Sequence, residues 1–464
     1  MRAHGRGHRA GRDAAGPGTG RDGKRPAAGR ESAERGRTEV ARGLGELGTL
    51  LLDAGYAVTD AHRAVASAAD GGGRADIATE VFPTLVFVDD PDADGTRMTV
   101  APGRSLTYGQ VSAAGRLAAD ASRGEVPLDE LAARVEAIET SVSRFPVWAT
   151  LLGSGLMSAG IAVVFGAPWW AVAASIVLGM GVGVALGALG RSPRAAAAAP
   201  FFAALLVSLA IWALGTLIGA HEIPLFAVCG PLAILIPGTT ITNAVLEVSG
   251  GDLVSGGGRL VSGLVTWALL AAGVLVTVVW FGSEIDGQDL VLPTGSAATQ
   301  DALGFWAQIP SAGLRWAGAA AVAIGFGLYF SAPATLTIGI TAVLLFSYTV
   351  LGVAQPFFGG PVAGGVSAGV TLIASRVIER LHPRWPSVVL FRPAFWLLVP
   401  GSLGLVTALG FAADAPSPGQ AGLKVVVSVI AITIGIQIGA LVAEVILPYR
   451  RGQHRPVLDL RARR

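Results

Sequence analysis

The chain has 464 residues, of which 52% are hydrophobic and 14% are charged. A soluble globular chain carries about 25% charged residues, so this composition excludes an ordinary soluble protein and indicates that most of the chain faces lipid. The formal net charge of +2 conceals an uneven distribution, because basic residues are concentrated at the two ends. The single cysteine, Cys229, excludes an intrachain disulfide and a Cys-x-x-Cys metal site.

Residues 1–43 are rich in Arg, Gly and Ala and lack the apolar core of a signal peptide. This composition predicts a disordered basic tail. Attraction to anionic lipid headgroups is one interpretation of the tail, and a solvated arm without a specific role is the favoured one.

Residues 44–145 have the pattern of a small water-soluble domain. Apolar residues from Leu44 to Val65 recur at spacings of three and four, which predicts an amphipathic helix. Residues 84–88 are mostly β-branched or aromatic, and 96–100 can return as the partner strand after a turn. Two more helices follow, so we expect a cytoplasmic α+β domain. It shows no nucleophile–base pair, metal cluster or phosphate loop, which leaves a regulatory and a purely structural role equally open.

The remainder of the chain is predominantly apolar. Spanning a bilayer takes about 20 apolar residues. Ten segments meet this description, and we expect them to be transmembrane helices: 147–166, 168–188, 197–219, 224–246, 260–281, 313–330, 333–353, 359–376, 387–410 and 423–447.

The charges in the connecting loops fit ten spans. Basic residues occupy alternate connections and the C-terminal tail: Arg191, Arg194, Arg259, Arg376, Arg380, Arg384 and Arg450. Acidic residues occupy the other connections: Glu222, Glu284, Asp286, Asp289, Asp301 and Asp414. The positive-inside rule therefore places both termini in the cytoplasm. The membrane that we expect is a bacterial plasma (inner) membrane. This topology predicts a first five-helix repeat over 146–282, an extracytoplasmic linker over 283–312, a second repeat over 313–447 and a basic cytoplasmic tail over 448–464.

One short sequence occurs twice. Leu235-Ile236-Pro237-Gly238-Thr239 and Leu398-Val399-Pro400-Gly401-Ser402 each lie in the fourth of five predicted helices. A second copy of a five-helix unit must enter the bilayer from the opposite side, as in transporters built from inverted repeats with broken helices. The expected fold is therefore an all-α membrane protein, a 5+5 inverted repeat with broken fourth helices behind a small α+β domain.

The paired breaks also predict a binding site. Proline removes a backbone donor, and the freed carbonyls must find partners or face a polar cavity. Thr239 and Ser402 can each cap a new half-helix, whose positive ends would converge on an anion near the midplane. The alternative is a kinked helix without a binding function. Two breaks at equivalent positions favour the binding site over this alternative. The predicted substrate-binding residues are Pro237, Gly238, Thr239, Thr240, Asn243, Pro400, Gly401 and Ser402.

Three carboxylates inside or beside the spans are candidates for proton coupling, because such groups are costly in a membrane. They are Glu247, Asp252 and Glu444. Glu247 and Asp252 are the better candidates, although either can instead pair with Arg259. Glu444 can be an interfacial residue close to Arg450. Arg392, in the ninth predicted span, can reach the inner surface or neutralise a carboxylate.

The sequence resembles the threonine/serine exporter family. The resemblance is carried by 236–245, by Gly251-Asp252-Leu253-Val254-Ser255-Gly256, by Leu51-Leu52-Asp53-Ala54-Gly55-Tyr56 and by the second Pro-Gly motif. It covers roughly 44–447. It implies export of small hydroxy amino acids from the cytoplasm, driven by the proton motive force. The family also contains two-chain members associated with succinate export. Glu247 stands where the family pattern leads us to expect Asp, which puts its role as proton carrier in doubt.

We therefore expect a secondary transporter for L-threonine and L-serine that works by proton antiport, and not an enzyme. A dicarboxylate exporter for succinate is the first alternative, since convergent helix ends suit that anion too. A membrane sensor that uses 44–145 as its working domain is the second. The expected partners are the amino-acid substrate, protons and the lipid bilayer, with a homo-oligomer left open and nucleic acid excluded. No cofactor or metal is expected.

Overall fold

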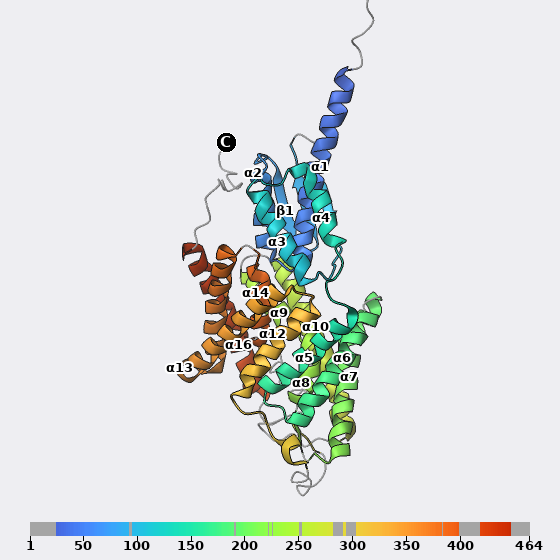
Figure 1. Cartoon of the computed structure of the whole chain (residues 1–464), viewed down its shortest axis with the longest axis vertical. Helices are drawn as coiled ribbons and strands as arrows, with labels where there is room; N and C mark the ends of the chain where they lie inside the picture. Colours follow the sequence, from blue (N-terminus) through green and yellow to red (C-terminus); the bar gives the residue numbers. More distant parts are fainter. Residues whose placement is uncertain are drawn as a thin grey trace, which may run out of the picture.

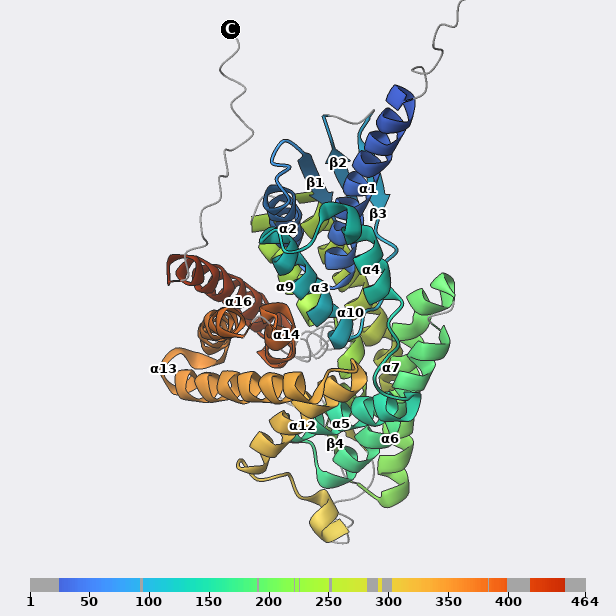
Figure 2. The ribbon, with the colours of Figure 1, turned by 45° about the horizontal axis from the view of Figure 1, so that its top comes forward.

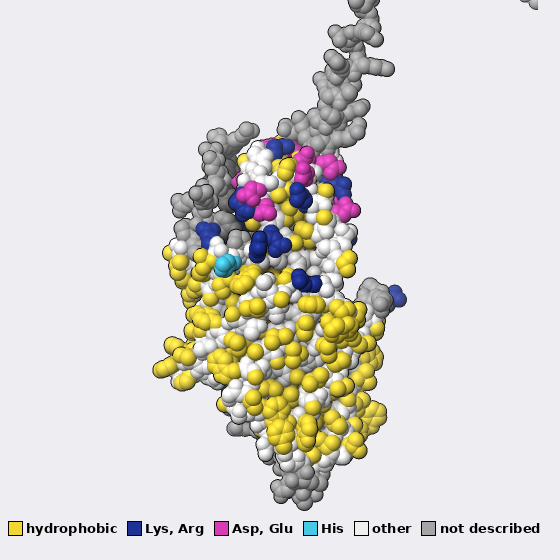
Figure 3. Space-filling model, viewed as in Figure 1, with side chains coloured by type: hydrophobic (Ala, Val, Ile, Leu, Met, Phe, Trp, Pro, Cys, Tyr) yellow, Lys and Arg dark blue, Asp and Glu magenta, His cyan; other side chains and the backbone are white. Residues whose placement is uncertain are grey.

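The computed structural model describes residues 25–91, 95–189, 192–220, 222–224, 226–249, 253–281, 291–293, 303–382, 384–398 and 418–446. It is mostly helical, with a small mixed domain at one end of a larger helical body (Figure 1). Side chains on the face shown in Figure 3 divide in the same way. Charged groups gather on the small domain, whereas the helical body is covered by apolar side chains.

The small domain, called the N-terminal domain below, packs helices against one side of a three-stranded antiparallel sheet ordered β1-β2-β3. Val86 and Val88 of the sheet and Leu47 and Leu51 of the first helix are fully buried in its core. Its elements are α1 (Arg25–Asp53), α2 (Val58–Gly71), β1 (Ala78–Phe82), β2 (Leu85–Asp89), β3 (Arg97–Val100), α3 (Tyr108–Ser122), η1 (Leu128–Glu130) and α4 (Leu131–Glu139).

Three details of this domain differ from the sequence-based expectation. The single helix expected from Leu44 to Val65 is divided between α1 and α2, which end and begin on either side of Gly55. The predicted strand pair is present as β2 and β3, but β1 adds a third strand that was not predicted. Helix α1 begins at Arg25, so the expected disordered tail does not extend to residue 43. Arg42 pairs with Glu46 at 2.8 Å and with Glu39 at 3.9 Å, which stabilises the helix on both sides of residue 43.

The helical body consists of a first half, α5 to α10, and a second half, α12 to α16. The first half comprises α5 (Val147–Val164), α6 (Trp169–Leu189), α7 (Pro193–Ile218), α8 (Phe226–Leu232), η2 (Ala233–Leu235), α9 (Gly238–Ser249) and α10 (Leu253–Phe281). The second half comprises α12 (Leu314–Tyr329), α13 (Ala334–Leu381), α14 (Ser387–Leu398) and α16 (Pro418–Ile446), preceded by the short η4 (Gly304–Ala307).

Within the described residues, six helices are long and apolar enough to cross a membrane, namely α5, α6, α7, α10, α13 and α16. The predicted seventh and eighth spans form the single element α13, which is interrupted by non-helical backbone at Gly359. The predicted fourth span is split into α8 and α9, and the ninth is described as far as Leu398. The chain is therefore a multi-pass membrane protein, and the count of ten spans stays a prediction.

Several helix ends in the two halves differ by the same 165 residues, the distance from Trp169 to Ala334, where α6 and α13 begin, whereas Pro237 and Pro400 differ by 163. The same shift separates the ends of α5 and α12, and both ends of α10 and α16. It also superposes Phe165-Gly166-Ala167-Pro168 on Phe330-Ser331-Ala332-Pro333. Gly166 has a φ of 74°, and Ser331 is the one non-glycine residue with positive φ in the described chain, at 52°.

Helices α5 and α12 cross at two pairs of glycines. A Cβ added to Gly160 would lie 2.6 Å from the carbonyl oxygen of Gly318, and one on Gly153 would lie 2.8 Å from that of Gly325. Under the 165-residue shift, Gly153 corresponds to Gly318 and Gly160 to Gly325. Each pair therefore maps onto the other, as in a contact across a two-fold axis.

Helices α13 and α16 also pack against one another (Figure 2). A Cβ on Gly435 would lie 1.9 Å from the Gly365 carbonyl oxygen, and one on Gly439 would lie 2.6 Å from that of Gly369. Backbone thus packs directly on backbone, which is how small residues hold membrane helices together.

Loops predicted on one side of the membrane contact each other. Strand β4 (Glu222–Pro224) pairs antiparallel with β5 (Val291–Pro293), and both belong to connections predicted as external. The backbone amide of Trp169, at the outer end of the predicted second span, donates to the carbonyl oxygen of Gln308 in the predicted external linker, at 3.1 Å. These contacts agree with the alternation derived from the loop charges.

Candidate functional site

The chain breaks at the first Pro-Gly motif. Helix α8 and the turn η2 end at Leu235, Ile236 is extended with φ −68° and ψ 117°, and α9 begins at Gly238. Pro237 is buried, and its carbonyl oxygen accepts from the amide of Ile241 at 3.1 Å. The first amides of α9 precede any intrahelical partner, so this terminus carries the positive end of a helix.

The predicted binding residues are described to different extents. Thr240 is half-buried in the first turn of α9. Gly238, Thr239 and Asn243 lie on α9, but the side chains of Thr239 and Asn243 are outside what the structure describes. Pro400, Gly401 and Ser402 lie outside the described residues altogether, so convergence of the two breaks stays a prediction.

Helix α9 lies between the two halves. On one side it packs on α10, where a Cβ on Gly256 would meet the Ala244 carbonyl oxygen at 2.6 Å. On the other side Ile241 shares a buried cluster with Val425 and Val429 of α16. The half-helix that follows the break therefore forms part of the interface between the halves.

Glu247 sits near the end of α9 with its side chain 6% exposed. Its Oε2 accepts a hydrogen bond from Ser255 Oγ at 2.6 Å and lies 3.3 Å from Arg259 Nε. Its Oε1 is buried and has no hydrogen-bond partner among the described residues. A buried carboxylate with one free oxygen has a vacant position for a proton. The expected alternative of pairing with Arg259 is thus observed, and it leaves half of the carboxylate unused.

The other two predicted proton carriers are not placed in this cluster. Asp252 lies outside the described residues, and Glu444 lies on α16 with a side chain that is not described. Ser255, on the neighbouring helix α10, belongs to the 251–256 motif singled out in the sequence, but its contact with Glu247 was not predicted. The spacing from Glu247 to Ser255 crosses a helix-to-helix connection, so helical periodicity gives no signal for it.

A second group of polar contacts joins the N-terminal domain to the second half. Arg392 of α14 directs Nη2 at the carbonyl oxygens of Ala54 and Gly55, at 3.3 and 3.5 Å. Ser112 donates to the Arg384 carbonyl oxygen at 3.0 Å, and the Tyr108 amide donates to the Phe330 carbonyl oxygen at 2.7 Å. Arg392 therefore reaches the domain beyond the membrane segment rather than a carboxylate.

Tyr108 lies fully buried at this junction. Its ring stacks on Phe330, with centroids 4.7 Å apart and planes 7° from parallel. Burial raises the pKa of Tyr108 to about 12, and the nearby positive charge of Arg392 opposes that rise. The phenol therefore stays neutral at physiological pH.

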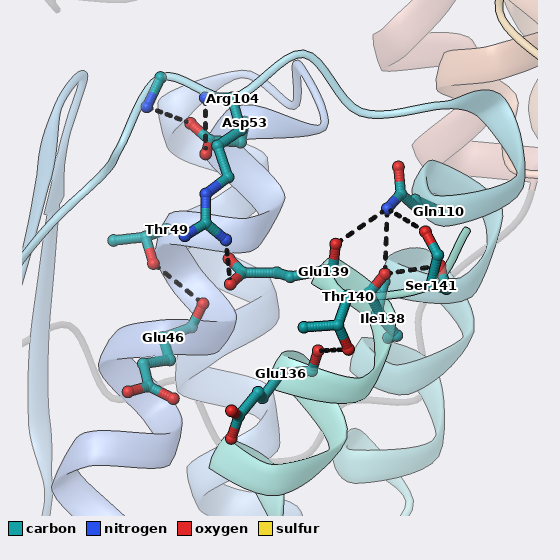
Figure 4. Close-up of polar contacts among 11 residues, drawn as sticks. Glu46, Thr49, Asp53, Arg104, Gln110, Glu136, Ile138, Glu139, Thr140 and Ser141 are labelled. Atoms are coloured by element: carbon teal, nitrogen blue, oxygen red, sulfur yellow. Dashed lines mark hydrogen bonds and ion pairs between the residues drawn. The ribbon is translucent and has the colours of Figure 1, made fainter. Parts of the chain in front are cut away.

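Hydrogen bonds inside the domain hold this junction in shape (Figure 4). Asp53, at the end of α1, accepts from the amides of Gly103 and Arg104 at 3.1 and 3.0 Å. Gln110, in the first turn of α3, donates to the carbonyl oxygens of Ile138 and Glu139 at 3.1 and 3.2 Å. The ends of α1, α3 and α4 are thereby fixed relative to one another beside the membrane segments.

Gly55 is required at its position. Its φ is +83°, and a Cβ there would lie 1.8 Å from Arg392 Nη2. We expect Gly55→Ala to displace Arg392 and to destabilise the protein by about 1–3 kcal/mol, because overpacking and left-handed backbone strain add together. Thermal unfolding of the purified protein in detergent measures this loss. Gly73→Ala, with φ +78° but open space around it, controls for the backbone strain alone.

The described residues contain no group of three or more His, Cys, Asp or Glu side chains that could hold a metal ion. One family model, described as "ThrE: Putative threonine/serine exporter", matches residues 42–280. This match covers the N-terminal domain from the second half of α1 onward and the first half of the helical body up to the last turn of α10. No curated protein and no solved structure matches the chain.

Proposed function

Because the chain belongs to the threonine/serine exporter family, we propose that it exports L-threonine and L-serine from the cytoplasm in exchange for protons. The observation that carries this proposal is the helix break at Pro237, inside the segment that the family model matches. The half-helix after the break lies against the other half of the molecule. A substrate bound there would contact both halves.

We propose that the two halves form a 5+5 inverted repeat. The 165-residue shift relates helix ends in both halves, and the glycine contacts between α5 and α12 map onto each other under it. Two antiparallel helices that exchange places about an axis in the membrane plane have this relation. Alternating access then consists of one half rocking against the other.

We propose that the substrate carboxylate binds at the start of α9, facing the backbone amides of its first turn. A helix N-terminus favours a negative charge. Thr240 and Asn243 on the same helix would contact the hydroxyl or ammonium group. The equivalent contribution from the second half would come from Pro400, Gly401 and Ser402.

We propose Glu247 as the proton carrier, ahead of Asp252 and Glu444. Its support is the buried cluster with Ser255 and Arg259. Protonation of Glu247 would cancel its charge and weaken the contact with Arg259 across α9 and α10. Proton binding would thereby weaken the packing of α9, the half-helix that binds the substrate, against α10.

Threonine counterflow in proteoliposomes tests the proposal, with an imposed pH gradient and with unlabelled succinate as competitor. We expect labelled threonine to accumulate against its gradient, to follow the sign of the pH gradient and to ignore succinate. Vesicles with a proton ionophore provide the control. Transport of succinate without transport of threonine would contradict the substrate assignment and support the dicarboxylate alternative.

A further inference from the structure

Arg392 lies on α14, the helix that leads toward the second Pro-Gly motif, yet its contacts are with the N-terminal domain. Nη2 approaches the carbonyl oxygens of Ala54 and Gly55, which follow the last turn of α1. That turn contains no basic residue of its own. The carbonyl end of a helix carries partial negative charge, which a cation stabilises. Arg392 therefore supplies from a distant segment the charge that α1 lacks.

The junction is shaped for this side chain. Gly55 leaves the space that the guanidinium occupies, since a Cβ there would lie 1.8 Å from Nη2. Tyr108 closes the junction from α3 and stacks on Phe330, in the connection between α12 and α13. Asp53 and Gln110 fix the ends of α1 and α4 behind it. The carbonyl oxygens that bind Arg392 are thus fixed within the N-terminal domain by its own hydrogen bonds.

Further contacts, all from residues that precede Arg392 in the chain, hold the same two bodies together. Arg376 of α13 lies 3.2 Å from Asp60 of α2, and Ser112 of α3 donates to the Arg384 carbonyl oxygen. At the start of α14, Pro386 packs against Gly115 of α3, where an added Cβ would lie 3.7 Å from Pro386 Cβ. The N-terminal domain thus contacts α14 both at the start of the helix and at Arg392.

We propose that Arg392 is a positioning residue for transport, which fixes α14 to the N-terminal domain so that the domain and this half-helix move as one body. The inference rests on the proposed transport function. In this proposal the domain keeps α14, the helix that precedes the second Pro-Gly motif, in place while the first half moves.

The packing of Gly115 on Pro386 allows a disulfide to replace the arginine. Native disulfides have Cβ atoms roughly 3.5–4.5 Å apart, and this pair falls within that range at 3.7 Å. Gly115→Cys and Pro386→Cys would be combined in a full-length chain carrying Cys229→Ala, with and without Arg392→Gln. A Cβ at residue 115 would also meet the Tyr56 hydroxyl at 2.6 Å, which is the movable end of a long side chain. The single substitutions and reduction with a thiol provide matched controls.

Transport is measured in proteoliposomes with the labelled substrate, threonine or succinate, that the unmodified protein carries. We expect Arg392→Gln to lower the maximal rate at least about fivefold while the half-saturating substrate concentration stays unchanged. Arg392→Lys should recover part of the rate. Oxidation of the cysteine pair should restore the Arg392→Gln rate to within about twofold of the unmodified protein, and reduction should abolish that gain.

Three results would overturn the inference. The first is an Arg392→Gln protein that transports as fast as the unmodified one. The second is a disulfide that forms but restores nothing, since Arg392 would then act in some other way. The third is a disulfide that stops transport when Arg392 is intact, because the domain and α14 would then have to separate during the cycle. Absence of threonine transport by the unmodified protein would instead count against the proposed substrate.

Discussion

Glu247→Gln is expected to abolish threonine accumulation driven by a pH gradient, while exchange of labelled for unlabelled threonine continues. Glutamine keeps the shape of the side chain and can still accept the Ser255 hydrogen bond, but it cannot take up a proton. The pH gradient could therefore no longer change the charge at this position of α9. Driven accumulation should fall by about tenfold or more, to the level of passive exchange. Both activities are measured in the same proteoliposomes.

Arg259→Gln separates proton binding from packing. This variant leaves the Glu247 carboxylate buried without its cation, so we expect α9 to pack less firmly on α10 and the thermal midpoint in detergent to fall. The double variant Glu247→Gln with Arg259→Gln removes both charges and should insert as well as the unmodified protein. Driven accumulation that survives in Glu247→Gln would exclude Glu247 and direct attention to Asp252 or Glu444.

Gly435→Ala is expected to be among the most damaging single-methyl substitutions in the membrane segment. Its Cβ would lie 1.9 Å from the Gly365 carbonyl oxygen and 2.6 Å from the carbonyl carbon. Neither atom belongs to a movable side chain, so α16 would have to shift away from α13. We expect a loss of about 1–3 kcal/mol or more in the free energy of unfolding. The thermal midpoint and the yield of monodisperse protein in detergent report this loss.

Gly352→Ala is the matched control. This glycine lies in α13, and nothing lies within 4 Å of the position that its Cβ would take. Alanine should therefore be neutral or stabilise the helix by up to about 1 kcal/mol. Equal damage from both substitutions would show that the close contact between α13 and α16 does not determine stability.

The features that local chemistry controls could be predicted from the sequence. A proline in an apolar helix must interrupt hydrogen bonding, and the chain does break at Pro237. Strands β2 and β3 followed from β-branched runs around a turn. The start of α1 was predicted wrongly because Arg, Gly and Ala dominated the composition. The spacing of Glu39, Arg42 and Glu46 was a helical signal within the same segment.

The features that depend on distant segments could not be predicted in this way. Glu247 was a candidate from its cost in a membrane, but its contact with Ser255 depends on how α9 packs on α10. Arg392 was expected at the inner surface or beside a carboxylate, and no local pattern connects it with Gly55. The Phe-x-Ala-Pro repeat, by contrast, was present in the sequence and was not predicted. It gives the 165-residue shift directly.

The contact between Arg392 and Ala54 also affects the order of events during synthesis, because 338 positions separate the two residues. At roughly 5–20 residues per second, Arg392 is added roughly 20–70 s after Ala54. The N-terminal domain therefore folds long before α14 is synthesised. The surface around Gly55 and Tyr108 stays exposed to solvent while the intervening helices are inserted into the bilayer. Docking of the domain would be one of the last steps of biogenesis, so it could report to the cell's proteases that the second half has been inserted.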